Sequence, residues 1–556
     1  MKTWKIVSPI LPLLALLWSL AKIWPVLPAV MQDEYIYSME ARFTPLSQLP
    51  YPNFLYAWIY SSTNIFGSDF YQAVKIYNAV FFALLLLFTY LIAKRFVSHT
   101  YSILIASVTA LSPTHLYLSY FMPDMPFFTL VIGTVWLLLV AVEKNVLWWW
   151  AIVGVMLGLA SLMKPHALFA VPALAILAFL NSFKNIATEK RWINGLSGLG
   201  YFLGAFLITK LGLGFVLAGP TGITLFGGYG GADAVISNLS SSTESKPANG
   251  VLQRTALETV LGITPGHFMV HLSLLIFVAG VALILPVSIL LKVFKKSDSI
   301  SPAGNLLLVV GLISVSFALA ISFFEGYIST GDDHTHRILF RYYEFIYPLL
   351  LLATVVAAKY VAPKSWVRAI QALVVSVASI FVVSFFLDSS FQIQFSDSGL
   401  ISGIVRNPPL AIFFVVVTLG TAITWLIKAE VGEKVLPWAT ALFLILFGAA
   451  AQGSLLHDVG SQYAYFDVAG RAAKAELPNT KGQDLVVISK SRTQAFVVKF
   501  WVDKPQITEV LSMGQSPVAL TDLGRAKYAV VLDGIQVEGN HPVVTSGDRY
   551  QILDLK

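Results

Sequence analysis

The chain has 556 residues, of which 56% are hydrophobic and only 12% are charged, and its mean hydropathy is +0.74. A protein with so little polar surface cannot be a water-soluble globule, so the composition predicts a membrane protein that is solvated mainly by lipid. The formal net charge of +7 comes from Lys and Arg in short loops, which indicates membrane topology rather than nucleic-acid binding, and the absence of cysteine excludes disulfides, thiolate metal sites and cysteine nucleophiles.

The apolar segments begin close to the N-terminus. Lys2 and Lys5 precede an apolar stretch that reaches about Val30. We interpret this stretch as a retained first helix and not as a signal peptide, because further spans follow and no small-residue cleavage site precedes Gln32. Apolar runs of roughly 17 to 25 residues can cross a hydrocarbon core of about 30 Å. About thirteen such helices are expected, near residues 5–28, 75–93, 100–119, 126–142, 146–163, 167–183, 194–217, 267–291, 304–324, 345–362, 367–387, 408–427 and 435–454.

The loops expected on the inner side are all basic. They contain Lys94 and Arg95, Lys144, Lys184 with Lys190 and Arg191, Lys292 with Lys295 and Lys296, Lys359 with Lys364 and Arg368, and Lys428 with Lys434. The positive-inside rule therefore predicts a cytoplasmic N-terminus, and an odd number of spans places everything after about Gln452 outside. The chain has no internal repeat of the kind that marks many secondary transporters.

Four segments are expected on the outer side. Residues 30–74 alternate aromatic and polar side chains, which is typical of helices lying at the membrane interface. Residues 218–266 are Gly-rich and then Ser-rich, which predicts a flexible loop. Residues 325–344 are dense in ionisable groups, and the tail forms the fourth segment. The domain division expected from this organisation is a transmembrane domain over 1–455 and a soluble extracytoplasmic domain over 456–556.

The tail predicts a small α/β domain. A helix over about 463–476 is followed by a strand (DLVVIS), a second helix (QAFVVKFWV), a strand, a further strand (YAVVLD) and a final strand (YQILDL). The fold class is therefore an α-helical polytopic membrane protein with a small C-terminal α/β domain.

Ionisable residues gather at the outer ends of the expected helices. These residues are Asp33, Glu34, Asp124, Lys164, Arg337 and Arg341. Each has an ordinary interpretation by itself: Asp33 with Glu34 as a solvated pair at a helix end, Asp124 as a turn residue, and Lys164 as an interfacial lysine. Charges at the membrane boundary are costly and tend to be functional, so the combination predicts a site for an anionic lipid and a proton acceptor.

Short motifs around these residues resemble a known family. The Asp-Glu pair after the first helix (MQDEYIY), the acidic residue in a Pro-flanked turn (FMPDMP), the lysine after the fifth helix (LMKPHALF) and the topology together resemble the GT-C glycosyltransferases. Within that superfamily the chain is similar to the branch of the protein O-mannosyltransferases and the lipid A aminoarabinose transferase. The segment HRILFRYYEFIYP resembles an Arg/Tyr-rich stretch of bacterial and arabinosyl-transferring relatives. The WWDYG-like motif of oligosaccharyltransferases is absent from the sequence.

The resemblance implies a polyprenyl-phosphate-linked monosaccharide as donor and inversion at the anomeric carbon. It implies that Asp33 is the base that takes the proton of the acceptor hydroxyl, that Glu34 orients it, and that Asp124 positions the acceptor, tunes Asp33 or holds a metal. The residues expected to bind the lipid phosphate are Lys164 and Arg341, with Arg337 and His336 as weaker candidates.

Cofactors and partners follow from the same resemblance. A divalent cation (Mg²⁺, Mn²⁺ or Ca²⁺) is an open alternative, with oxygen or nitrogen ligands from Asp33, Asp124, Asp332 or His336. The acceptor is expected to be a glycan, a lipid or a protein such as a pilin, with membrane lipids as further partners and no nucleic acid. The expected location is the bacterial cytoplasmic (inner) membrane.

Three other functions remain open from the sequence. A lipid-linked oligosaccharide ligase or polymerase would share the outer site and the lipid-linked donor. A lipid-linked sugar transporter would place ionisable residues near mid-span, whereas here only Lys210 lies inside a helix, in its outer half. A membrane scaffold would not explain the carboxylates and cations. We rank the monosaccharide transferase first.

Overall fold

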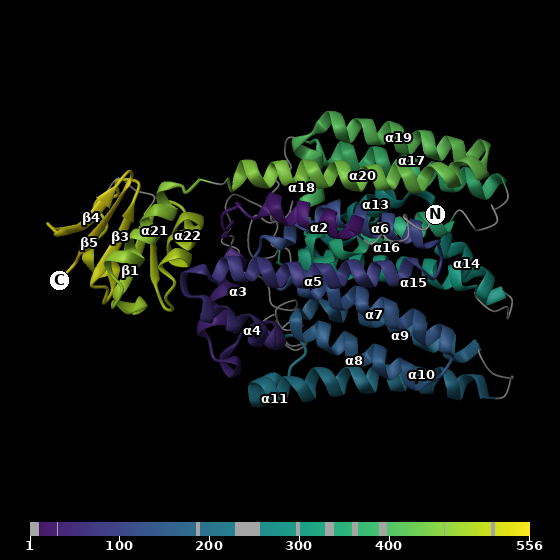
Figure 1. The fold of residues 1–556 in the computed structure, drawn as a ribbon, viewed down its shortest axis with the longest axis horizontal. Helices are drawn as coiled ribbons and strands as arrows, with labels where there is room; N and C mark the ends of the chain where they lie inside the picture. Colours follow the sequence, from purple (N-terminus) through teal and green to yellow (C-terminus); the bar gives the residue numbers. More distant parts are fainter. Residues whose placement is uncertain are drawn as a thin grey trace.

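The protein is a helical bundle with a small sheet domain attached at one end (Figure 1). The computed structural model describes residues 10–30, 32–184, 190–227, 256–295, 301–328, 338–357, 365–388, 397–460, 462–512 and 517–556. The elements of the N-terminal half are α2 (Ile10–Ile23), α3 (Gln32–Phe43), η1 (Leu46–Gln48), α4 (Phe54–Ser61), η2 (Ser62–Asp69), α5 (Phe70–Ala93), α6 (His99–Leu111), η3 (Pro113–Leu118), α7 (Asp124–Lys144), α8 (Trp148–Met163), η4 (Pro165–Ala170), α9 (Val171–Lys184), α10 (Arg191–Leu207), the π-helix η6 (Ile208–Leu213), α11 (Gly214–Ala218) and η7 (Gly219–Gly222).

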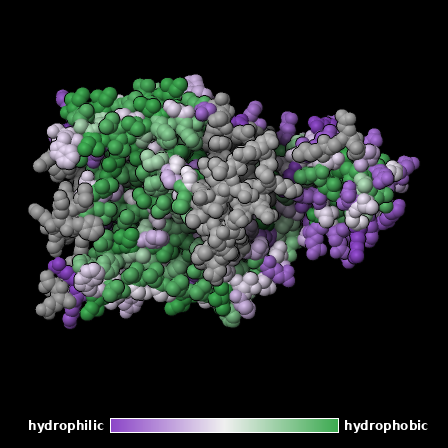
Figure 2. Space-filling view, turned by 180° about the vertical axis from the view of Figure 1, so that it is seen from behind, coloured by the Kyte–Doolittle hydropathy of each residue, from purple (hydrophilic) through white to green (hydrophobic). Residues whose placement is uncertain are grey.

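The second half of the bundle continues with long apolar helices. Its elements are α13 (Ala256–Ala279), η9 (Gly280–Leu283), α14 (Leu285–Lys295), α15 (Pro302–Ile328), η10 (Phe340–Ile346), α16 (Tyr347–Ala357), α17 (Ser365–Phe386), α18 (Gly399–Arg406), α19 (Pro408–Ile427) and α20 (Ala429–Asp458). Figure 2 shows a broad hydrophobic surface over the bundle and a hydrophilic surface over the C-terminal domain, as expected for a multi-pass membrane protein with a water-exposed part.

The expected spans agree with the observed helices. Within the described ranges each of the predicted apolar segments overlaps at least one helix, and ten helices there are long and apolar enough to cross a membrane. Three further segments form shorter apolar helices, Ile10–Ile23, His99–Leu111 and Trp148–Met163. The helical membrane fold is therefore confirmed, whereas the number thirteen stays a prediction.

Several helix boundaries differ from the prediction. The expected helix 100–119 ends at Leu111, because Pro113 cannot continue it and starts a 3₁₀ turn instead. The expected helix 267–291 begins earlier, at Ala256, and tolerates Pro265 inside it. This helix then stops at Gly280, whose φ of +54° is a left-handed conformation that favours glycine. Of the loop expected over 218–266, residues 228–255 lie outside the described ranges.

The described part of the C-terminal domain contains two α-helices, two short 3₁₀ helices and one sheet. The elements are α21 (Tyr465–Glu476), η11 (Gly482–Asp484), β1 (Leu485–Ser489), α22 (Arg492–Val502), β2 (Thr508–Leu511), η12 (Leu520–Leu523), β3 (Tyr528–Leu532), β4 (Val543–Gly547) and β5 (Tyr550–Asp554). The strand order is β2-β1-β3-β5-β4, with β1 parallel to β2 and β3, and β5 antiparallel to β3 and β4. The prediction missed β4, an edge strand with mostly exposed residues and therefore without an alternating apolar pattern.

The C-terminal domain packs through α22 directly on α3. The ring of Phe496 stacks on Tyr35 with centroids 5.3 Å apart, and Phe500 lies 5.3 Å from Phe70. The guanidinium of Arg42 in α3 donates to both carboxylate oxygens of Asp503, at 2.5 and 3.2 Å. Both side chains of this ion pair are at least nine-tenths buried, so it holds the soluble domain in a fixed position against the membrane domain.

The Arg42–Asp503 pair yields a test of this docking. The Asp503→Ala substitution leaves a buried guanidinium without its carboxylate, which costs about 3 kcal/mol. We expect faster proteolytic cleavage between α20 and α21 and a lower melting temperature of the purified protein. The control is Glu538→Ala, which removes an exposed carboxylate of the same domain and should leave both measurements unchanged. Equal behaviour of the two variants would contradict the docking role.

Candidate functional site

The two adjacent carboxylates of α3 have different surroundings. The side chain of Asp33 is 42% exposed, whereas Glu34 is fully buried. The carboxylate of Glu34 accepts the backbone N–H of Val30 at 2.8 Å and that of Phe121 at 2.8 Å. Burial raises the pKa of Glu34 to about 7, although these two hydrogen bonds and Lys75 act in the opposite direction. Glu34 therefore joins the start of α3 to the segment before α7, while Asp33 remains accessible.

The second carboxylate of the site is paired with a buried lysine. Asp124 is the first residue of α7, and its Oδ1 accepts a hydrogen bond from the Nζ of Lys164 at 2.6 Å. Lys164 follows the last residue of α8 in an extended conformation, so its side chain leaves the helix axis and reaches α7. The side chains of both residues are at most 2% exposed. A charge pair buried this deeply needs close contact, since each ion has lost its hydration.

A second ion pair joins α3 to η10. The Nη2 of Arg341 donates to the Oδ2 of Asp33, and the Arg341 side chain is 7% exposed. The ring of Tyr342 lies between the two pairs, with its centroid 4.6 Å from the Nζ of Lys164 and 5.1 Å from the guanidinium of Arg341. Two basic side chains thus contact one aromatic ring, and each of them is paired with a carboxylate.

A hydrogen-bond network holds the start of η10 in place. Glu325 near the end of α15 accepts from His267 at 2.7 Å, from His271 at 3.0 Å and from the backbone N–H of Leu339 at 2.5 Å. The hydroxyl of Tyr343 bonds the other ring nitrogen of His271 at 2.5 Å. All of these residues are buried. The network fixes the backbone on both sides of Arg341 to α13 and α15.

The other end of η10 is anchored to α18. The carboxylate of Glu344 accepts from the hydroxyl of Ser398 at 2.5 Å, and the backbone N–H of Arg341 donates to the carbonyl of Asp397 at 2.9 Å. Glu325 and Glu344, which the sequence placed in an ionisable outer segment, are in fact buried anchors of η10. The position of Arg341 therefore depends on three separate helices.

The structure brings four of the predicted site residues together. Asp33 and Arg341 form one pair, Asp124 and Lys164 form the other, and Tyr342 connects them. Glu34 follows Asp33 in the chain but binds backbone groups instead. His336 and Arg337, with Asp332 and His334, lie outside the described residues. Within the ranges that the structure describes, no group of three or more His, Cys, Asp or Glu side chains could hold a metal ion.

Sequence reasoning missed several residues around the site. Tyr342 lies in the segment HRILFRYYEFIYP, whose Arg/Tyr pattern predicts a role for the arginines but none for Tyr342. The ring of His166, two residues after Lys164, packs on the ring of Tyr342, with the two centroids 4.1 Å apart. Glu40 in α3 is 5% exposed and carries no motif that would have marked it. Its burial depends on the packing of α4 on α3, which leaves no local pattern in the sequence.

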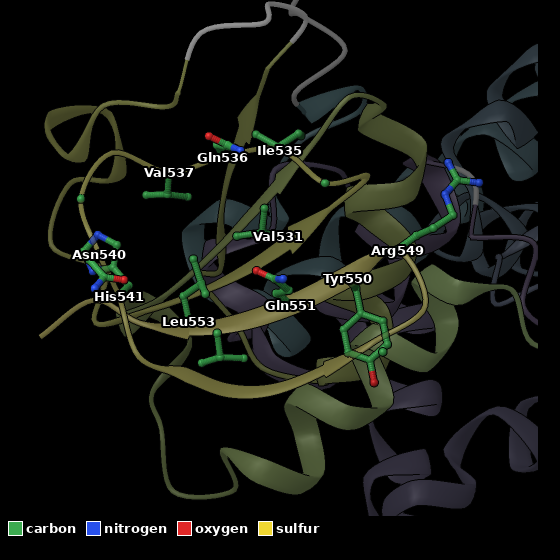
Figure 3. Close-up of a pocket in the computed structure, with 14 residues that line it drawn as sticks. Val531, Ile535, Gln536, Val537, Asn540, His541, Arg549, Tyr550, Gln551 and Leu553 are labelled. Atoms are coloured by element: carbon green, nitrogen blue, oxygen red, sulfur yellow. The ribbon is translucent and has the colours of Figure 1, made fainter.

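A pocket of about 460 Å³ lies elsewhere, in the C-terminal domain (Figure 3). Its lining comes from β5 and from the segment that connects β3 to β4, and includes His541, Arg549 and Gln551. Arg549 is paired with Asp533 at 2.5 Å. Figure 1 places β4 and β5 at the end of the molecule that is farthest from the helical bundle, so this pocket is separate from the two ion pairs.

The buried carboxyls of α3 predict how stability depends on pH. Burial raises the pKa of Glu40, like that of Glu34, from 4.5 to about 7. The folded protein then binds more protons than the unfolded chain between these values, so its stability falls as the pH rises from about 4.5 to about 7. Glu40→Gln removes one of these groups, and we expect it to stabilise the protein on the order of 1–3 kcal/mol at pH 8 and far less at pH 5. Thermal unfolding at the two pH values measures this difference, and an equal effect at both would contradict it.

The chain is similar to one known family over part of its length. Residues 51–208 match the model of the family described as dolichyl-phosphate-mannose-protein mannosyltransferase. This segment contains Asp124 and Lys164 but neither Asp33 nor Arg341. A search of curated proteins found no significant match.

Solved structures with a similar arrangement of elements share little sequence identity with the chain. ArnT from Cupriavidus metallidurans in the apo state matches over 99% of this chain and 98% of its own, with 13% identity and a TM-score of 0.45. The same protein bound to undecaprenyl phosphate matches over 100% and 98%, with 12% identity and a TM-score of 0.46. The archaeal oligosaccharyltransferase AglB from Archaeoglobus fulgidus, in complex with an inhibitory peptide and a dolichol-phosphate, matches over 95% and 69%, with 11% identity and a TM-score of 0.38. The match over residues 51–208 confirms the resemblance to the GT-C membrane glycosyltransferases that the sequence motifs indicate.

Proposed function

We propose that this protein transfers a single sugar from a polyprenyl-phosphate donor to a hydroxyl acceptor at the outer face of a bacterial cytoplasmic membrane. The observation that carries the proposal is the pair of buried cations, Lys164 and Arg341, that meet at the ring of Tyr342. A lipid phosphate is an anion that arrives from the membrane, and two fixed cations stabilise the charge that it gains when it leaves the sugar. The family match supports the same donor class, because the description of that family names dolichyl-phosphate mannose.

The Asp33–Arg341 pair suggests how the base is set free. When the donor binds, its phosphate competes with Asp33 for the guanidinium of Arg341, since Arg binds phosphate in a bidentate manner. Asp33 is the more exposed partner, so it can turn away from Arg341 without leaving a deeply buried charge unpaired. The released carboxylate then accepts the proton of the acceptor hydroxyl.

The proposed reaction is a single displacement at the anomeric carbon. The acceptor oxygen forms a bond to this carbon, the bond from the carbon to the phosphate oxygen breaks, and the proton of the acceptor moves to Asp33. The lipid phosphate keeps the electron pair of the broken bond and is held by Lys164 and Arg341. Attack from the side opposite the phosphate inverts the anomeric configuration. Asp124 orients Lys164 through their 2.6 Å hydrogen bond, and its negative charge favours the protonated lysine.

An in vitro transfer assay tests the function. Purified protein is incubated with a panel of synthetic polyprenyl-phosphate monosaccharides and with glycan, lipid and pilin-type acceptors. We expect transfer from one donor, and we expect Asp33→Asn to lower the rate by at least about a hundredfold, because an amide cannot take the proton. The amide oxygen of this variant can still accept a hydrogen bond from Arg341, so the protein should remain folded, with at most a moderately lower melting temperature.

Two results would contradict the proposal. Turnover by Asp33→Asn at the wild-type rate would exclude Asp33 as the base. Failure with every monosaccharide donor, together with transfer of a preassembled glycan from a pyrophosphate-linked lipid, would favour an oligosaccharide ligase instead.

The same assay tests the role of a divalent cation. If Lys164 and Arg341 supply the positive charge at the phosphate, activity should survive thorough EDTA treatment and should not rise when Mg²⁺, Mn²⁺ or Ca²⁺ is added back. Loss of activity with EDTA and its recovery with one of these ions would instead assign a catalytic metal. A binding measurement on Lys164→Ala serves as the comparison. This variant should have a lower affinity for undecaprenyl phosphate than the wild type, both with and without EDTA.

A further inference from the structure

Four buried oxygen atoms beside the Asp124–Lys164 pair have no hydrogen-bond partner within the described part of the chain. They are the Oε1 of Glu40, the Oδ1 of Asn53, the Oη of Tyr56 and the Oδ2 of Asp124. All four residues are at most 5% exposed. A buried polar atom without a partner costs about 1–3 kcal/mol, so four of them in one place need an explanation.

Glu40 lies in α3, Asn53 and Tyr56 lie at the start of α4, which packs on α3, and Asp124 is the first residue of α7. The Nδ2 of Asn53 donates to the other oxygen of Glu40 at 3.3 Å. The hydroxyl of Tyr56 is near enough to Glu40 and Asp124 for the charge of both carboxylates to act on it. Glu40 lies on the same helix as Asp33, the proposed base, about two turns further along.

The side chain of Asn53 does not make the hydrogen bond that is usual at its position in a helix. Asn53 is the N-cap of α4, where an Asn side-chain oxygen normally accepts a backbone N–H of the first turn. Here the side chain makes no capping hydrogen bond, and its oxygen is among the four unpartnered atoms. The side chain thus gives up a stabilising contact that is usual for its position.

The buried side chain of Lys210 binds the backbone next to Asn53. The Nζ of Lys210 donates to the carbonyl of Pro52 at 3.2 Å and to that of Ser161 at 3.1 Å. Lys210 belongs to the π-helix η6, a local widening of a helix that is frequent at functional sites. Because Pro52 precedes Asn53 and Ser161 lies one turn before Lys164, this bridge fixes the cluster relative to the phosphate-binding lysine.

The chemistry of the four atoms specifies the group that they would bind. The oxygens of Glu40, Asn53 and Asp124 are acceptors, and the hydroxyl of Tyr56 can donate or accept. Their complement is a compact group with several O–H donors. The other oxygen of Asp124 binds Lys164, so a group placed here is adjacent to the phosphate.

We propose that Glu40, Asn53, Tyr56 and Asp124 form a subsite that binds the hydroxyl groups of the sugar ring carried by the polyprenyl-phosphate donor. The inference rests on the proposed function and adds the location of the sugar to it. Glu40, Asn53 and Tyr56 bind the ring, and the bond between the anomeric carbon and the phosphate then lies between this subsite and the two cations. Asp33 approaches from α3, the helix that also carries Glu40.

A binding measurement tests the subsite independently of turnover. The probes are undecaprenyl phosphate and its mannosyl and arabinosyl esters, and the quantity of interest is the ratio of the Kd of the bare lipid to that of the ester. We expect at least one ester to bind roughly tenfold or more tightly than the bare lipid. Tyr56→Phe, which removes a hydroxyl that has no partner among the described residues, should lower this ratio roughly fivefold to tenfold and leave the melting temperature unchanged.

Two further variants separate binding of the sugar from a structural role. In Glu40→Gln the amide oxygen must take the place of Oε2, because this atom accepts the hydrogen bond of Asn53, so the amide N–H₂ group takes the place of Oε1. This variant should lower the Kd ratio and stabilise the protein at pH 8. The matched control is Tyr60→Phe, one turn further along α4, whose hydroxyl has a partner in Asn78 at 2.5 Å. Tyr60→Phe should lower the melting temperature and leave the ratio unchanged.

The outcomes distinguish the subsite from the function. If neither ester binds more tightly than undecaprenyl phosphate, or if the gain survives in Tyr56→Phe and Glu40→Gln, the subsite is overturned, and the transferase proposal stands as long as transfer is observed. If the gain is lost in these variants but no donor supports transfer, the subsite stands as a sugar-binding site and the proposed reaction is wrong.

Discussion

The pairing of buried charge is the constraint on which this structure depends. Lys164 and Asp124 are almost fully removed from solvent, and an isolated ion in such a place is strongly destabilising. The fold therefore brings the end of α8 and the start of α7 into contact and places Tyr342 of η10 over the lysine. An anion-binding site of the proposed kind needs cations that stay buried in place while no anion is bound. A carboxylate partner allows this, because a phosphate can later replace it.

The surroundings of the site are arranged to resist movement. η10 is held at both ends, by Glu325 with its histidines and by Glu344 with Ser398, so Arg341 has little freedom to leave its place. The soluble domain adds a further restraint, since Arg42 and Asp503 tie α22 to α3, the helix that carries Asp33. An acceptor bound on the soluble domain would thus be connected to the proposed base through one rigid helix. Rigid support of this kind reduces the reorganisation that a reaction requires.

Two adjacent acidic residues illustrate how burial decides function. Asp33 and Glu34 are neighbours in the chain, but successive residues of a helix point about 100° apart. Glu34 points into the protein, where its carboxylate accepts hydrogen bonds from two backbone N–H groups. Asp33 points towards Arg341 and is partly exposed. Glu40, two turns after Asp33, is buried at a cost in stability at neutral pH. Such a cost is typical of residues kept for binding rather than for folding.

The sequence by itself determined the membrane class and the positions of the apolar helices, and it singled out four residues of the proposed site. Apolar runs and boundary charges follow from local composition, so Asp33, Asp124, Lys164 and Arg341 could be singled out before any contact was known. Only the tertiary structure decided which carboxylate pairs with which cation, that Glu34 binds backbone groups, and that Tyr342 joins the two pairs. It also decided that Glu40, Asn53 and Tyr56 meet, because burial and hydrogen-bond satisfaction depend on residues distant in the chain and leave no local pattern in the sequence.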